Sequence, residues 1–285
     1  MSFGSLDVMV VAARADMDLA SNCLRSLTKH LPQVGAVRLV TNAVTDGLRV
    51  ADEVGLPDVE VIADEELLSP SEQKLPGWYR QQVLKLRAGS VLSGDMFAVM
   101  SGDTWLLRSL EGSELAAPDG RPYLQVNRYR YASPHLAYEQ QRVDAVASLL
   151  GVEPGRSREL GDFICDFFCF ERELLDLTLD RLAQMHGANW TRILDGRGTT
   201  LSDMTMFGEY TTYAVAALEL AERPPPVRIG EESHVLQIHS RRSLGHATFE
   251  APILHLVDKS IPLGDVEAAI ERSRQAASNS QGDVV

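Results

Sequence analysis

The sequence predicts an α/β fold with a mixed, mostly parallel central sheet and helices on both faces. Two observations carry this prediction. The first 65 residues contain three apolar strand-like runs with an amphipathic helix between the first two, as at the start of a doubly wound sheet. A further apolar run, 97–100, follows another helix and ends on the polar segment Ser101-Gly102-Asp103-Thr104. Open α/β sheets bind ligands at the carboxyl ends of their strands, so this segment is the first candidate site.

Hydrophobic periodicity gives the elements in chain order. Apolar runs predict strands at 6–13, 37–41, 59–63, 97–100, 121–126, 163–170 and 235–239. Periodic segments predict helices at 19–31, from 77 onward, and at 136–150, 174–186, 204–222 and 264–277. The acidic segment 64–76 is expected to be an exposed loop, and 195–200 a mobile one. We find no internal repeat and no linker, so one domain over 1–278 is expected, with a disordered tail at 279–285.

Composition excludes several classes of partner. The chain of 285 residues has a net charge of -13, which disfavours a nucleic-acid polymer or a polybasic membrane contact. No apolar run is long enough to span a membrane, and the N-terminus lacks the pattern of a signal peptide. Cys23, Cys165 and Cys169 show no metal-type spacing and cannot all pair. A cytoplasmic protein is therefore expected, while the oligomeric state is not constrained.

Common nucleotide and nucleophile motifs are absent. The turn after the first strand, 12–16, contains no glycine, so it matches neither G-x-G-x-x-G nor a P-loop. A G-x-S-x-G nucleophile elbow is also missing. The helix that begins at residue 77 has two faces. One face, which is expected to pack in the core, carries Tyr79, Val83 and Leu86. The second face carries Trp78, Gln82 and Lys85.

At this point the chain resembles the GT-A glycosyltransferases, and most closely a bacterial GT-A-like group of largely unassigned function. The resemblance rests on an opening strand followed by an aspartate, on the QQVLKL segment at 81–86, and on an apolar strand that ends in an acidic motif. It implies a Rossmann-like sandwich with a nucleotide-sugar-binding half, 1–110, and an acceptor-binding half, 111–278. It also implies that the helix from residue 77 faces the donor through Arg80, Gln81 and Lys85.

The same resemblance suggests a metal site. In the superfamily an Asp-x-Asp motif holds a divalent metal on the nucleotide diphosphate, whereas here Ser101 replaces the first acid. The resemblance thus implies Mg²⁺ or Mn²⁺ at Asp103, with Ser101 giving a hydroxyl or a ribose contact. His239 is expected as a further ligand, and Arg241 and Arg242 as neutralising groups for the departing nucleoside diphosphate.

The resemblance also implies a carboxylate general base among the acidic residues that follow. Glu209 is the first candidate, Asp166 the second, and Asp203 a competitor for the role of Glu209. Period-two alternation in the predicted strand 163–170 places Asp166 on a face with Ile164 and Phe168, either capping a neighbouring loop or facing the acceptor. His255, in an apolar run, is expected to be a core residue.

Together these features predict an enzyme that moves a hexose from a nucleotide sugar to a hydroxyl of a small-molecule acceptor. UDP-glucose is the expected donor, a natural product or nucleoside the expected acceptor, and inversion the expected stereochemistry. Two alternatives stay open: a non-catalytic nucleotide-sugar-binding protein, which the incomplete acidic motif favours, and a nucleotidyltransferase. The latter would normally carry a glycine-rich loop after the first strand.

Overall fold

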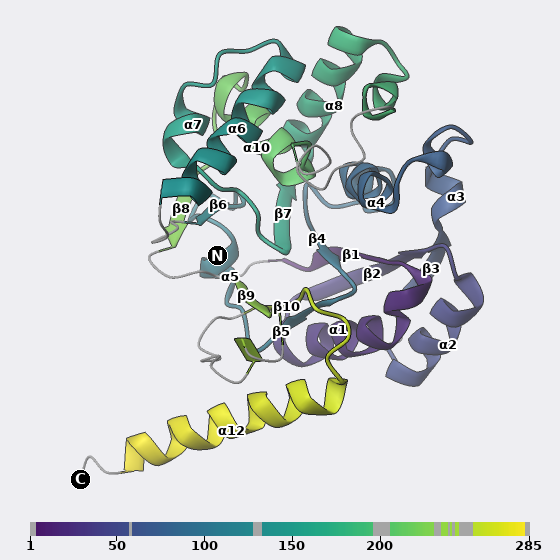
Figure 1. Ribbon diagram of the computed structural model, residues 1–285, viewed down its shortest axis with the longest axis vertical. Coiled ribbons are helices and arrows are strands. Elements are labelled where there is room, and N and C mark those ends of the chain that lie inside the picture. Colours follow the sequence, from purple (N-terminus) through teal and green to yellow (C-terminus); the bar gives the residue numbers. More distant parts are fainter. Residues whose placement is uncertain are drawn as a thin grey trace.

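Within the residues that it describes, the computed structural model shows three sheets and helices packed around them (Figure 1). It describes residues 4–56, 59–127, 133–195, 206–230, 235–238, 240, 243–244 and 253–282. The described strands are β1 Leu6–Ala12, β2 Val34–Thr41, β3 Val59–Ala63, β4 Met96–Ser101, β5 Thr104–Leu106, β6 Leu124–Asn127, β7 Phe167–Glu171, β8 Val227–Gly230, β9 Val235–Ile238 and β10 Ile253–Leu256. The described α-helices are α1 Met17–His30, α2 Val44–Val54, α3 Asp64–Leu67, α4 Gly77–Leu86, α5 Gly112–Leu115, α6 Ser133–Leu150, α7 Arg156–Leu160, α8 Arg172–His186, α10 Glu209–Glu219 and α12 Leu263–Gly282.

The main sheet has the strand order β3-β2-β1-β4-β7. The first four strands are parallel, and β7 closes the edge antiparallel to β4. β1 and β4 are almost fully buried because they are apolar on both faces and lie in the middle of the sheet. The predicted fold class, a mixed, mostly parallel sheet with helices on both faces, is confirmed.

Helices cover the two faces of this sheet. α1 and α2 pack together on one face, while α4, α8 and α10 lie on the other, with α6 packed against α10 (Figure 1). In the smaller sheet, of order β5-β10-β9, the late strand β10 pairs with β5, which follows directly after β4, and with β9. This connection matters for function, because it brings residues near 255 to the carboxyl end of β4.

Several elements differ from the sequence-based expectation. α2 was not expected. It packs with α1, and its Gly47 and Val50 are buried. β10, which carries His255, was not expected either. Strand β7 begins at Phe167 instead of residue 163, so Asp166 precedes the strand and the alternation argument does not apply to it. The expected loop 64–76 contains the short helix α3.

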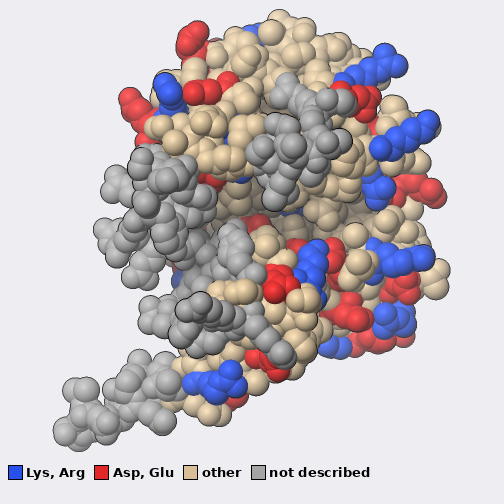
Figure 2. Space-filling view, in the orientation of Figure 1, with Lys and Arg blue, Asp and Glu red and all other residues tan. Residues whose placement is uncertain are grey.

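α12 runs along one edge of the molecule and projects from it (Figure 1). Its first turns pack inward through the buried Val266 and Ala269. Among the described residues no helix has the length and hydropathy needed to cross a membrane. On the face drawn in Figure 2, the coloured Lys and Arg side chains are interspersed with Asp and Glu.

Candidate functional site

A cavity of about 490 Å³ opens at the carboxyl end of β4, bordered by α4, α6, α10 and β10. Its volume lies within the range of small-molecule sites. Charged and amide side chains from distant parts of the sequence line it: Gln81, Gln82, Lys85, Asp103, Glu139, Arg142, Asp166, Glu209, His255 and Lys259. Ser101, Trp78 and Tyr138 also contribute to the lining.

The turn between β4 and β5 presents Asp103 to this cavity. Gly102 allows the turn to lie against β1 and α1, because a Cβ there would stand 2.7 Å from the Ala12 Cβ and 3.3 Å from the Ala20 Cβ. The Gly102 N–H donates to the Val11 carbonyl at 2.9 Å, and the Asp103 carbonyl accepts from the Leu256 N–H at 3.0 Å. The position of Asp103 is therefore fixed from both sides, by β1 and by β10.

Asp103 is flanked by two cations. Lys259 Nζ lies 3.0 Å from Asp103 Oδ2, and His255 Nε2 lies 3.7 Å from Oδ1. Burial raises the pKa of Asp103, but His255 and Lys259 outweigh burial and hold that pKa well below its ordinary value. Asp103 is therefore a carboxylate at neutral pH that already faces positive charge on both oxygens.

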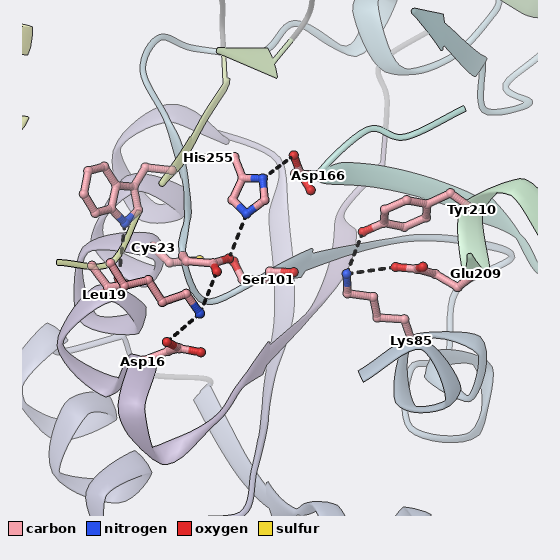
Figure 3. A network of polar contacts seen from close by, with 12 residues as sticks. Asp16, Leu19, Cys23, Lys85, Ser101, Asp166, Glu209, Tyr210 and His255 are labelled. Carbon is pink, nitrogen blue, oxygen red and sulfur yellow. Dashed lines mark hydrogen bonds and ion pairs between the residues drawn. The ribbon is translucent and has the colours of Figure 1, made fainter. Parts of the chain in front are cut away.

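His255 bridges two carboxylates. Its Nδ1 lies 3.0 Å from Asp166 Oδ2 (Figure 3). Its Nε2 faces Asp103. Burial lowers the pKa of the imidazole, but the charges of Asp166 and Asp103 outweigh it and raise the pKa to about 10. The residue expected in the core is instead a protonated group in the cavity wall.

On the opposite side of the cavity, Lys85 of α4 is paired with the start of α10. Lys85 Nζ donates to Glu209 Oε1 at 2.8 Å and to Tyr210 Oη at 3.1 Å (Figure 3). The side chains of Lys85 and Glu209 are each only 4% exposed. Gln82 Oε1 accepts the Glu209 N–H at 3.1 Å, which satisfies a free donor at the N-terminus of α10. This pair ties α4 to α10.

A second buried pair comes from α6. Arg142 Nη1 donates to Glu139 Oε2 at 2.7 Å, and both side chains are nearly inaccessible. Burial and the neighbouring Asp162 carboxylate raise the pKa of Glu139 to about 7, against the opposing charge of Arg142. Neither Glu139 nor Arg142 was singled out from the sequence, because nothing in its pattern marks them among the other residues of α6.

A narrower hollow of about 70 Å³ adjoins the cavity at the carboxyl ends of β1 and β2. Its wall includes Ala13, Asn42, Asp64, Arg80 and Gln81, and Gln81 also lines the larger cavity. Arg80 Nη2 lies 3.3 Å from Asp64 Oδ2. The structure thus places Arg80 at the narrow hollow and Lys85 at the wide cavity.

Most of the predicted site residues meet at these two hollows. Gln81, Lys85, Ser101, Asp103, Asp166 and Glu209 line the wide cavity, and Arg80 lines the narrow hollow. Predicted residues His239, Arg241, Arg242 and Asp203 lie outside the described residues. His255 and Lys259 were missed as site residues. The sequence contains one feature that could have identified His255, namely that this polar residue interrupts an apolar run.

The described surroundings of Asp103 do not fit a divalent metal. Among the described residues no group of three or more His, Cys, Asp or Glu side chains is arranged to hold one. Lys259 Nζ and His255 Nε2 already stand against the two oxygens of Asp103, where a metal would have to bind. The expected contribution of His239 stays a prediction.

Comparison with solved structures defines the class of fold. The galactosyltransferase LgtC, solved with donor and acceptor sugar analogs, matches with a TM-score of 0.53 and 11% identity over 96% of each chain. The glycosyltransferase GlyE from Streptococcus pneumoniae TIGR4 matches with a TM-score of 0.50 and 12% identity over 95% of this chain and 60% of that chain. The protein therefore has the GT-A glycosyltransferase fold.

Residues 22–238 match the family of unknown function DUF6492, and the chain belongs to this family. A search of curated proteins gives no match.

Proposed function

We propose that the protein transfers a hexose from a nucleotide sugar to a hydroxyl of a small-molecule acceptor. One observation carries this proposal: the narrow hollow and the wide cavity adjoin each other at the carboxyl edge of the parallel strands and share Gln81. Open α/β sheets bind ligands at this edge. A ligand with a nucleoside at one end and a sugar at the other suits a narrow hollow that opens into a wider one.

In this arrangement the nucleoside lies in the narrow hollow. Asn42 and Asp64 offer hydrogen-bond acceptors there, and Arg80 offers donors. The diphosphate then lies near Ser101 and Lys259, and the sugar enters the wide cavity beside Lys85. UDP-glucose is the first donor to test, and a natural product or nucleoside the first acceptor.

We assign the general base to Asp166 in preference to Glu209. Protonating Glu209 would leave the buried Lys85 ammonium beside the neutral Tyr210 hydroxyl, whereas protonating Asp166 leaves His255 still facing the Asp103 carboxylate. Asp166 lines the same cavity and is held by His255 at 3.0 Å. His255 is thereby a positioning residue for the carboxylate that would take the proton from the acceptor hydroxyl.

The test uses the full chain with UDP-, GDP-, ADP- and TDP-hexoses and a panel of hydroxyl acceptors. We expect acceptor-dependent release of one nucleoside diphosphate. Asp166→Asn should lower kcat by about 10²-fold or more, with donor Kd changed less than about threefold. Glu209→Gln is the matched comparison. A larger loss of kcat in Glu209→Gln than in Asp166→Asn would return the base assignment to Glu209.

A non-catalytic nucleotide-sugar-binding protein is the second candidate. It is favoured by Ser101, which stands where the motif normally has its first acid, and by His255 and Lys259, which offset the charge of Asp103. Tight binding of a nucleotide sugar without release or transfer would support this alternative. Absence of binding to every nucleotide tested would contradict both.

We also propose a cytoplasmic location, because Cys23, Cys165 and Cys169 are all free and buried.

A further inference from the structure

Lys259 joins two carboxylates that are far apart in the sequence. Its Nζ lies 2.7 Å from Asp16 Oδ1 and 3.0 Å from Asp103 Oδ2. The two aspartate side chains are 6% and 11% exposed, whereas that of Lys259 is 42% exposed and lines the cavity. One nitrogen thus bridges the turn after β1 and the turn after β4.

The position of this nitrogen is the position that a bridging cation would take. Two carboxylate oxygens from separate turns converge on it, which is the arrangement that commonly binds a hard divalent ion. Here an ammonium group occupies the point of convergence. A metal ion bound by Asp16 and Asp103 together would have to displace Lys259 first.

The ammonium also has a donor left for a ligand. An ammonium carries three N–H groups, and the two aspartates accept two of them. The exposure of Lys259 to the cavity leaves the third N–H available to a phosphate oxygen. Only four lysines occur in the chain, and two of them, Lys85 and Lys259, line this cavity.

We infer that Lys259 is a built-in cation that takes the place of a divalent metal at Asp103 and contacts the diphosphate of the donor. This inference deepens the proposed function and rests on it for the identity of the ligand. It predicts that donor binding persists when metals are removed. It also predicts that the protein gains a metal site when the ammonium is deleted.

The first experiment needs no nucleotide. Mn²⁺ is titrated into the wild type, Lys259→Met and the control Lys29→Met, with calorimetry and the Mn²⁺ electron paramagnetic resonance signal as readouts. Lys29 is exposed near the end of α1, so Lys29→Met makes the same substitution at a position outside the cavity. We expect Lys259→Met to bind one Mn²⁺ at least about tenfold more tightly than the wild type and the control. Asp103→Asn in the Lys259→Met background should abolish this gain. Equal Mn²⁺ affinity in wild type and Lys259→Met would overturn the inference.

The second experiment measures UDP binding by calorimetry in EDTA and in Mn²⁺. We expect wild-type Kd values in the two buffers to agree within about threefold. Lys259→Met should lose about tenfold or more in EDTA and recover in Mn²⁺, while Lys259→Arg, which keeps the charge, should lose less in EDTA. Wild-type binding that requires Mn²⁺ would overturn the inference, even if Lys259→Met does not fold.

The two proposals fail separately. If neither the wild type nor any variant binds UDP or another nucleoside diphosphate, the proposed function fails. The Mn²⁺ titration still decides whether Lys259 occupies a position between Asp16 and Asp103 that a metal ion could take. If UDP is bound, and hexose is transferred from UDP-hexose, only with Mn²⁺ present, the proposed function stands and the role of Lys259 as the cation is contradicted.

Discussion

At the residue scale, the pair Lys85–Glu209 shows how a charge in the cavity wall is kept at acceptable cost. Both side chains are buried, and the ammonium also lies 4.9 Å from the centroid of the Tyr210 ring. Removing one partner of such a pair leaves an unpaired buried charge, which commonly costs about 3–5 kcal/mol. Removing both partners avoids that penalty.

We therefore predict that Lys85→Met lowers the free energy of unfolding by about 3 kcal/mol and that Lys85→Met/Glu209→Gln recovers at least half of the loss. Urea denaturation followed by circular dichroism measures both. The exposed pair Arg49–Glu53 supplies the control, since Arg49→Met should change stability far less. A double variant no more stable than Lys85→Met would contradict this account of the pair.

The carboxyl of Glu139 gives a pH dependence whose sign is fixed. Its pKa is about 7 in the folded protein, against an ordinary value of 4.5. As pH rises through this window, the unfolded chain releases the proton before the folded one does, so the free energy of unfolding falls. Below the window the side chain is neutral in both states.

We expect the stability of the wild type to decline between about pH 5 and pH 7 and Glu139→Gln to lose most of that decline. Denaturation curves at several pH values for the two proteins provide the measurement. Parallel pH profiles would show that Glu139 does not titrate in this range.

At the element scale, the turn that joins β4 to β5 depends on the absence of a side chain at Gly102. A methyl group there would collide with Ala12 of β1. The turn would have to move, and Asp103 would move with it. This couples the packing of β1 directly to the geometry of the cavity.

Gly102→Ala should therefore lower Tm by several degrees and weaken UDP binding by about tenfold or more. Gly264→Ala in α12 is the matched control, because a Cβ at Gly264 would meet no atom within 4 Å. Thermal denaturation and calorimetry give the two readouts. A variant with wild-type Tm and Kd would mean that the turn tolerates the extra atom.

The elements also show which parts of the fold local sequence can predict. β1, β3, β4 and α4 were predicted because each shows a mainly apolar run or a clear helical face. α2 was missed because its sequence contains Thr45, Asp46 and Gly47 in its first turn. Gly47 is buried, and a Cβ there would stand 2.9 Å from Val61 Cγ1, so tertiary packing explains the glycine at this position.

For the site, the sequence indicated the residues that lie beside a recognisable element. Asp103, Ser101 and Lys85 follow or belong to such elements, and the structure brings them to one cavity. Lys259 could not be predicted, because its partner Asp16 is 243 positions away and no local pattern relates them. His255 was assigned to the core because its strand is apolar, and only the register with β5 shows that it faces Asp103.

At the scale of the whole molecule, the strands differ in how they are held. β1 lies between β2 and β4 and is almost entirely buried, whereas β6 and β8 form a separate two-stranded sheet. Backbone amides open for exchange through local unfolding, which is easiest where fewer buried contacts must be lost. Stability is therefore expected to be unevenly distributed across the fold.

Hydrogen exchange followed by mass spectrometry should show this distribution. We expect amides of β1 and β4 to exchange at least about 100-fold more slowly than those of β6 and β8. Uniform protection across the three sheets would indicate that the whole chain opens as one cooperative unit instead.

The bridge from Asp16 through Lys259 to Asp103 has a consequence for how the protein is made. During translation the two aspartates leave the ribosome long before residue 259 does, because both lie well before the middle of the 285 residues. For most of its synthesis the nascent chain therefore carries two carboxylates without their ammonium partner. The pocket acquires its final charge only after residue 259 has been added. A premature stop codon shortly before position 259 would thus remove the cation while leaving every strand of the main sheet encoded.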